Sequence, residues 1–124
     1  MRNNFKYRGK VLTGEKAGRT IGFPTVNLSP HLVPKTLTQG VYAARVEYKN
    51  KKYMGALYYG PRLVKNEKKA VLEIYIIDFN QEIYGEWISF DIVRFIRGIK
   101  NFDSMDLLKK QITIDIADIK KIST

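Results

Sequence analysis

The sequence predicts an all-β domain followed by a C-terminal helix, and three observations support this class. Six short segments rich in β-branched and aromatic residues are separated by turn signals at close spacing. Apolar side chains alternate within them, as at Tyr42, Ala44, Val46 and Tyr48. After Ser104 the apolar spacing changes to that of a helix. Strands that follow one another this closely favour an antiparallel barrel or a sandwich.

The expected strands cover residues 5–12, 23–28, 41–48, 53–59, 71–79 and 87–96. Asn50 supplies the turn between the third and fourth strands, and residues 78–85 form the hairpin connection before the last one. Ser104 is the expected N-cap of the helix, with Asp106 in its first turn. The helical spacing continues beyond Asp115, either in the same helix or in a second short piece that begins there. We expect this helix to lie against the barrel and to close one end.

Composition narrows the functional classes. The chain has 124 residues, so one domain over residues 1–124 is expected, and it has no cysteine, which excludes a disulfide scaffold, a thiolate zinc site and a cysteine nucleophile. No apolar run is long enough to cross a bilayer and the N-terminus lacks a signal-peptide core, so we expect no membrane partner and a cytoplasmic location. The net charge of +10 suggests an anionic partner, although a solvated basic surface explains it equally well.

The stretch with the most chemical content begins with a glycine-rich loop. Its backbone amides could approach a polyphosphate, and its cations could neutralise phosphate charge, with the arginine suited to a bidentate contact. The spacing is not that of a Walker A loop, and spacing alone favours an ordinary structural turn. The candidate nucleotide-binding residues in this loop are Gly14, Lys16, Gly18, Arg19 and Gly22.

The next residues suggest a metal-nucleotide site. Pro24 suits the start or the edge of a strand, because it fixes one backbone angle and lacks an amide hydrogen. In an extended chain Thr25 and Asn27 point to the same face. Their neutral oxygens suit Mg²⁺ or another hard divalent ion that keeps waters and phosphate oxygens. Judged on these residues alone, the favoured alternative is that both side chains merely satisfy backbone groups at a strand end.

The whole stretch resembles the signature of riboflavin kinases, including the kinase half of bacterial bifunctional riboflavin kinase/FAD synthetases. The resemblance rests on Gly14-x-x-x-Gly18-Arg19-x-x-Gly22-Phe23-Pro24-Thr25-x-Asn27-Leu28, of which Gly-Phe-Pro-Thr-x-Asn is the specific part. It continues in the family's order over nearly the whole chain, through residues 40–43, 72–79, 84–85, 95–97 and 101–104. It implies a six-stranded antiparallel Greek-key barrel. It also implies that Mg-ATP lies between the glycine loop and the Pro24–Asn27 strand, with Thr25 on the metal and Asn27 nearby.

The same resemblance implies transfer of the γ-phosphate of ATP to the 5′-hydroxyl of riboflavin, giving FMN and ADP, with Glu73 as general base. The residues agree, because an acid among the apolar side chains of its strand is costly unless it has a partner or a task. A positioned carboxylate can take a proton from an alcohol. Solvation of Glu73 at an open strand end is an equal alternative, and Glu82 and Glu86 are interpreted as surface charges. The expected flavin contacts are Phe95, Ile96, Phe102 and Leu107 with Arg97, although aromatic residues there are ordinarily core.

Two larger departures from the family pattern are visible, beside Val26 in place of the family's usual alanine. In the stretch from Tyr58 to Glu67 the Gly60-Pro61 turn remains, but the asparagine and threonine of the family's Asn-Pro-Thr turn are absent. No adenylyltransferase unit is seen before Met1, so a stand-alone kinase and a domain of a longer chain both stay open.

Two other functions compete with the kinase. One is a basic, tyrosine-rich barrel that binds RNA or single-stranded DNA without catalysis. The tyrosines fall on several strands and both faces, which counts against such a platform, so we expect no nucleic-acid partner. The other is a barrel that binds flavin without converting it, and the combination of Thr25, Asn27 and Glu73 counts against that.

Overall fold

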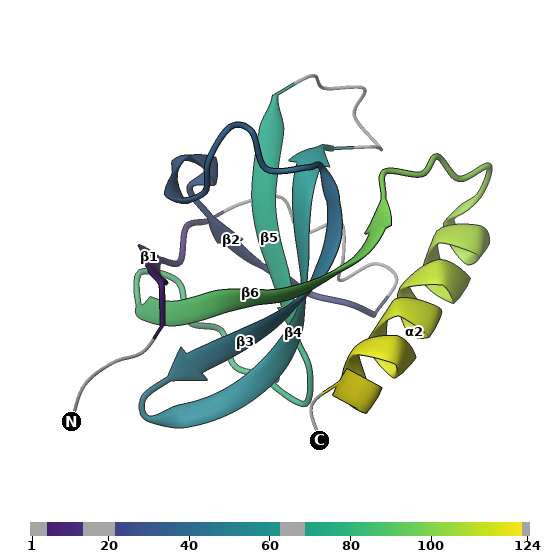
Figure 1. Ribbon diagram of the computed structural model, residues 1–124. Coiled ribbons are helices and arrows are strands. Elements are labelled where there is room, and N and C mark those ends of the chain that lie inside the picture. The colour runs from purple at the N-terminus through teal and green to yellow at the C-terminus, as the bar shows by residue number, and fades with distance from the viewer. Residues whose placement is uncertain (1–4, 14–21, 63–68, 123–124) are drawn as a thin grey trace.

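The computed structural model describes residues 5–13, 22–62 and 69–122, which form a six-stranded antiparallel sheet and one long helix (Figure 1). The predicted all-β class with a C-terminal helix is therefore confirmed. The elements are β1 (Tyr7–Lys10), β2 (Val26–Leu28), the 3₁₀ turn η1 (Pro30–Leu32), β3 (Gly40–Tyr48), β4 (Lys51–Pro61), β5 (Ala70–Ile76), β6 (Trp87–Gly98) and α2 (Met105–Ile122).

The sheet curls into a nearly closed barrel. Its strand order is β1-β6-β3-β4-β5-β2, and the two edges approach where Leu12 N donates to Asn27 O at 2.8 Å. The run β6-β3-β4-β5 has the spatial order 4-1-2-3 of a Greek key. The β3–β4 hairpin turns at Lys49 and Asn50, whose φ angles of 48° and 65° match a two-residue primed turn at the predicted place.

Two register shifts between β3 and β6 bend β6 around the barrel. Val41 pairs with Arg97 and Tyr42 with Phe95, and a second shift lies between Ala43 and Ala44. Such bulges insert an extra residue into one strand and increase its twist. The extra residues here are Val93 and Ile96, and both pack beneath α2 rather than into the barrel. The bulges therefore have two effects: they let the sheet close into a barrel, and they turn two apolar residues of β6 toward the helix.

The interior holds the residues that the alternation predicted. Tyr42, Ala44, Val46 and Tyr48 all belong to the main core. From β5 the interior residues are Leu72, Ile74 and Ile76, so Glu73 lies on the outer face of that strand.

Helix α2 packs on the outer face of the sheet through a second apolar cluster built around Ala43, Ile77 and Ile119 (Figure 1). The expectation that the helix closes one end of the barrel is wrong. Apolar residues on the outer face of β3, β4 and β6 would be exposed to water without the helix, so it packs along the side of the barrel. Its start is as predicted, since Leu107 N donates to Ser104 Oγ at 3.2 Å. A second piece near Asp115 does not occur, because Asp115 is a buried residue within the continuous helix.

Candidate active site

One row of paired residues crosses the outer face of the barrel and contains the candidate acid. Glu73 of β5 pairs with Asn27 of β2 on one side and with Tyr58 of β4 on the other. Tyr58 pairs with Val41 of β3, and Val41 pairs with Arg97 of β6. Directly opposed residues of an antiparallel sheet point to the same face. The barrel therefore aligns an amide, a carboxylate, a phenol and a guanidinium that are widely separated in the sequence.

Thr25 and Glu73 meet, as the site hypothesis requires. Thr25 Oγ1 donates a hydrogen bond to Glu73 Oε1 at 2.7 Å across 48 residues of sequence. Thr25 itself lies just before β2, which begins at Val26, so the expected strand 23–28 is shorter than predicted. Because the Thr25 hydroxyl donates its hydrogen bond to the carboxylate, the lone pairs of Oγ1 stay available to accept another hydrogen bond or to bind a cation.

Glu73 is held rather than simply solvated. Its side chain is only 19% exposed, and Arg62 Nε lies 3.9 Å from its second oxygen, Oε2. The alternative of a fully solvated acid at an open strand end is therefore wrong. The residue before β2 and the residue after β4 therefore each bring a polar group to one oxygen of this carboxylate.

A pocket of about 360 Å³ opens beside Thr25. Its lining includes Pro24, Thr25 and Val26 together with the connection from Phe79 to Tyr84. Apolar walls with a few polar groups, here a hydroxyl, amides and a phenol, are typical of small-molecule sites of this size. Glu82, interpreted from the sequence as a surface charge, also belongs to this lining. Glu86 accepts a hydrogen bond from Tyr48 at 2.6 Å and lies 3.6 Å from Lys49 Nζ.

The remaining nucleotide-site candidates are only partly described. Gly14, Lys16, Gly18 and Arg19 lie outside the described residues. Gly22 adopts φ of 88°, a backbone conformation that glycine tolerates better than other residues, directly before Phe23 and Pro24. Asn27 is buried with 8% of its surface exposed, beside Glu73 in the register.

The donor set fits a hard divalent ion that takes most of its ligands from elsewhere. Among the residues that the structure describes, no group of three or more His, Cys, Asp or Glu side chains could hold a metal ion. The oxygens of Thr25 and Asn27 are hard ligands, and Mg²⁺ characteristically combines few protein oxygens with phosphate oxygens and water.

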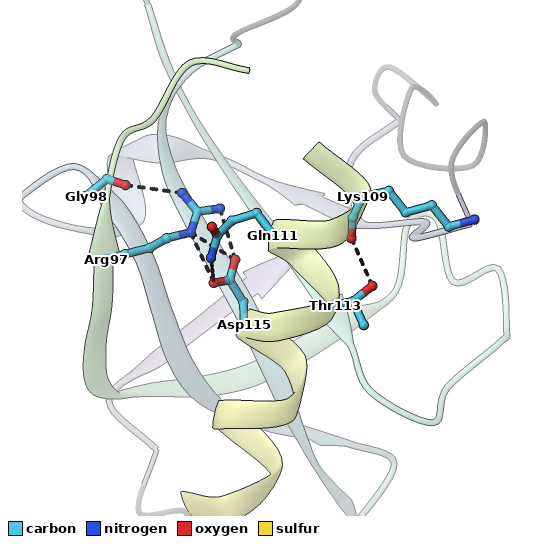
Figure 2. A network of polar contacts seen from close by, with 6 residues as sticks. All are labelled: Arg97, Gly98, Lys109, Gln111, Thr113 and Asp115. Atoms are coloured by element: carbon cyan, nitrogen blue, oxygen red, sulfur yellow. Dashed lines mark hydrogen bonds and ion pairs between the residues drawn. The ribbon is translucent and has the colours of Figure 1, made fainter. Parts of the chain in front are cut away.

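The candidate flavin contacts do not form one surface. Tyr42, which faces the interior, packs edge-on against Phe95, with ring centroids 5.2 Å apart. Arg97 faces outward and pairs with Asp115 of α2, with Nη2 to Oδ2 at 2.9 Å (Figure 2). The bulge at Ile96 therefore puts Phe95 and Arg97 on opposite faces of β6. Phe102 stays near Arg97, whose guanidinium carbon lies 5.8 Å from its ring centre, while Leu107 is 46% exposed and Ile96 packs beneath α2.

Sequence reasoning missed Tyr58, Arg62 and the pocket wall from Phe79 to Tyr84. Tyr58 and Arg62 belong to the stretch that departs from the family pattern, so no motif marked them. The pairing of β4 with β5 would have indicated Tyr58, since it places a residue directly opposite Glu73.

With this geometry in place, known proteins identify the class. A family model described as Flavokinase: Riboflavin kinase matches residues 1–123. The bifunctional riboflavin kinase/FMN adenylyltransferase of Haemophilus influenzae is 37% identical over 117 residues, which cover 94% of this chain and 38% of that protein. The chain belongs to the riboflavin kinase family, a family of kinase enzymes, as the sequence resemblance predicted.

Other relatives extend the comparison. The RNA-binding riboflavin kinase RibR of Bacillus subtilis is 36% identical over 115 residues, which cover 91% of this chain and 49% of that protein. A crystal structure described as a macrolide-efflux protein from Streptococcus pneumoniae has a TM-score of 0.78 and 37% identity, covering 92% of this chain and 38% of that one. The riboflavin kinase of Trypanosoma brucei has a TM-score of 0.63 at 22% identity, covering 94% and 77%, and supports the fold alone.

The chain spans less than half the length of the curated relatives named here. Within the described residues, no helix combines the length and the apolar character needed to cross a membrane.

Proposed function

We propose that this chain is a riboflavin kinase domain that transfers the γ-phosphate of ATP to the 5′-hydroxyl of riboflavin, giving FMN and ADP. The observation that carries the proposal is the 2.7 Å hydrogen bond between Thr25 and Glu73 at the edge of a pocket. It joins a candidate metal ligand to a candidate base, and phosphoryl transfer needs the metal-bound phosphate and the attacking hydroxyl close together.

The pocket beside Thr25 is the proposed site of ATP. Its polar groups can form hydrogen bonds with the adenine ring of ATP. Thr25, on the pocket lining, would then lie next to the metal-bound phosphates. Thr25 and Asn27 would hold Mg²⁺, which supplies charge neutralisation for the transferring phosphoryl group when bound. Gly14, Lys16, Gly18, Arg19 and Gly22 complete the proposed phosphate contacts.

The acceptor is proposed to approach Glu73 from the side of β4 and β6. Near that side, in the segment after β6, Ile99 is exposed and Phe102 is half-buried. Glu73 would take the proton of the riboflavin hydroxyl as the phosphorus–oxygen bond forms. Phe102, Leu107 and Arg97 are the flavin contacts that this approach favours, whereas Phe95 faces the other side of the sheet.

Chromatography of one reaction tests the proposal. Purified protein with ATP, Mg²⁺ and riboflavin is expected to yield FMN and ADP in equal amounts. Absence of FMN together with tight binding of labelled single-stranded RNA would favour the nucleic-acid alternative. The name of the Bacillus subtilis relative gives that alternative a specific basis. Four expectations stay predictions. They are the absence of a nucleic-acid partner, the cytoplasmic location, the single domain over residues 1–124 and an attached adenylyltransferase in a longer chain.

Thr25→Ala is expected to raise the KM for Mg-ATP by about 10-fold, because a metal ligand and its hydrogen bond to Glu73 are lost together. Thr25→Ser keeps the hydroxyl and is the matched control, with a KM near that of the wild type. Steady-state kinetics at varied Mg-ATP measures both. An unchanged KM in Thr25→Ala would remove Thr25 from the metal site.

A further inference from the structure

Tyr58 stands beside Glu73 on the outer face of the barrel, directly opposite it in the β4–β5 register. Burial and the Glu73 carboxylate raise the pKa of Tyr58 to about 12, while the Arg97 cation acts in the opposite direction. The phenol therefore stays protonated near neutral pH. Its hydroxyl donates to the backbone carbonyl of Pro61, three residues further along the chain.

That hydrogen bond fastens the end of β4. Pro61 is the last residue of the strand, and Arg62 follows it directly. Gly60 allows the close packing, because a Cβ there would lie 2.7 Å from Ile99 Cδ1 and 3.2 Å from the Tyr58 hydroxyl oxygen. The backbone that carries Arg62 is thus held by the phenol and by packing that a side chain at position 60 would disturb.

Arg62 approaches the carboxylate oxygen of Glu73 that Thr25 does not bond. Its Nε lies 3.9 Å from Oε2, while Thr25 Oγ1 bonds Oε1. A base works best when its oxygen is held in a fixed direction by neighbours that are themselves held in place. Arg62 can do this only while its own backbone position is maintained.

The geometry points to Tyr58 as a positioning residue for the phosphoryl transfer, whose hydroxyl acts through Pro61 to hold Arg62 against Glu73 and so orients the base. This role rests on the proposed function. Tyr58 lies in the stretch where the chain departs from the family's Asn-Pro-Thr turn.

Tyr58→Phe tests the role, because it keeps the ring and removes only the hydrogen bond. The kcat is expected to fall by about 3- to 10-fold, the equivalent of one hydrogen bond, with the KM for Mg-ATP within about twofold of the wild type. Tyr59→Phe is the matched control. It makes the same chemical change at the next residue, whose side chain belongs to the interior core. An unchanged kcat in Tyr58→Phe, or an equal loss in both variants, would overturn the role.

A double variant tests the route through Arg62. Arg62→Gln is expected to lower kcat at least as much as Tyr58→Phe, and Tyr58→Phe/Arg62→Gln no further than Arg62→Gln alone. Losses that multiply in the double variant would show that Tyr58 does not act through Arg62.

If the wild type formed no FMN, the proposed function would fail. A measurement on the ligand-free protein would still test whether the Tyr58 hydroxyl holds Arg62 in place. The heteronuclear NOE of the Arg62 Nε–H is then expected to show an ordered side chain in the wild type and a mobile one in Tyr58→Phe. Equal values in the two proteins would overturn the positioning role.

Discussion

Glu73→Gln is expected to lower kcat by about 100-fold or more while leaving the affinity for Mg-ATP nearly unchanged. Gln has the size of Glu and can still accept the Thr25 hydrogen bond through its amide oxygen, so the metal side of the site keeps its geometry. An amide cannot take the proton of an alcohol. The loss should therefore appear in the chemical step, measured as single-turnover FMN formation, and not in nucleotide binding, measured by calorimetry.

Glu86→Gln is a closely matched control for this variant. Glu86 also accepts a hydrogen bond from a side-chain hydroxyl, Tyr48 at 2.6 Å, and also lies near a cation, Lys49 at 3.6 Å. It differs from Glu73 in having no contact with Thr25 or with Arg62 among the interactions that the structure describes. Its kcat should stay within about twofold of the wild type. A Glu73→Gln enzyme with a kcat equally close to wild type would show that Glu73 is not the base.

The barrel was predictable because its strands are amphipathic and its turns are marked. The alternation at Tyr42, Ala44 and Val46 and the turn at Asn50 follow directly from local chemistry. The bulges in β6 were not predictable, because they arise from closure of the sheet and leave no binary pattern. They change which face a residue occupies, so the sequence alone could not separate Phe95 from Arg97.

The meeting of Thr25 with Glu73 was predictable only through the family signature. Nothing local in either segment specifies that β2 pairs with β5, which is a property of the Greek-key topology. Long-range register also explains why Tyr58 was missed, since its importance comes from the residue opposite it.

The Arg97–Asp115 ion pair joins β6 to α2 and is largely buried; Figure 2 shows its contacts. Asp115 has 3% of its side chain exposed and Arg97 has 19%. Arg97 Nε reaches both carboxylate oxygens, at 3.1 and 3.0 Å, and Gln111 Nε2 donates to Oδ1 at 3.0 Å. A buried ion pair adds little to the stability of the fold compared with a well-packed apolar pair. Removal of one partner, however, leaves the other charge buried without compensation.

Asp115→Asn is therefore expected to destabilise the protein by about 3 kcal/mol, because the Arg97 guanidinium stays largely buried without its counter-charge. For a chain of this size the melting temperature should fall by about 10 °C, measured by calorimetry or circular dichroism. Asp118→Asn, at an exposed position of the same helix, is the control and should change stability by no more than about 0.5 kcal/mol. Arg97→Met/Asp115→Leu should recover most of the loss, since it removes both charges and keeps the volume. Equal melting temperatures for Asp115→Asn and Asp118→Asn would show that apolar packing around Ile119, not the ion pair, holds the helix.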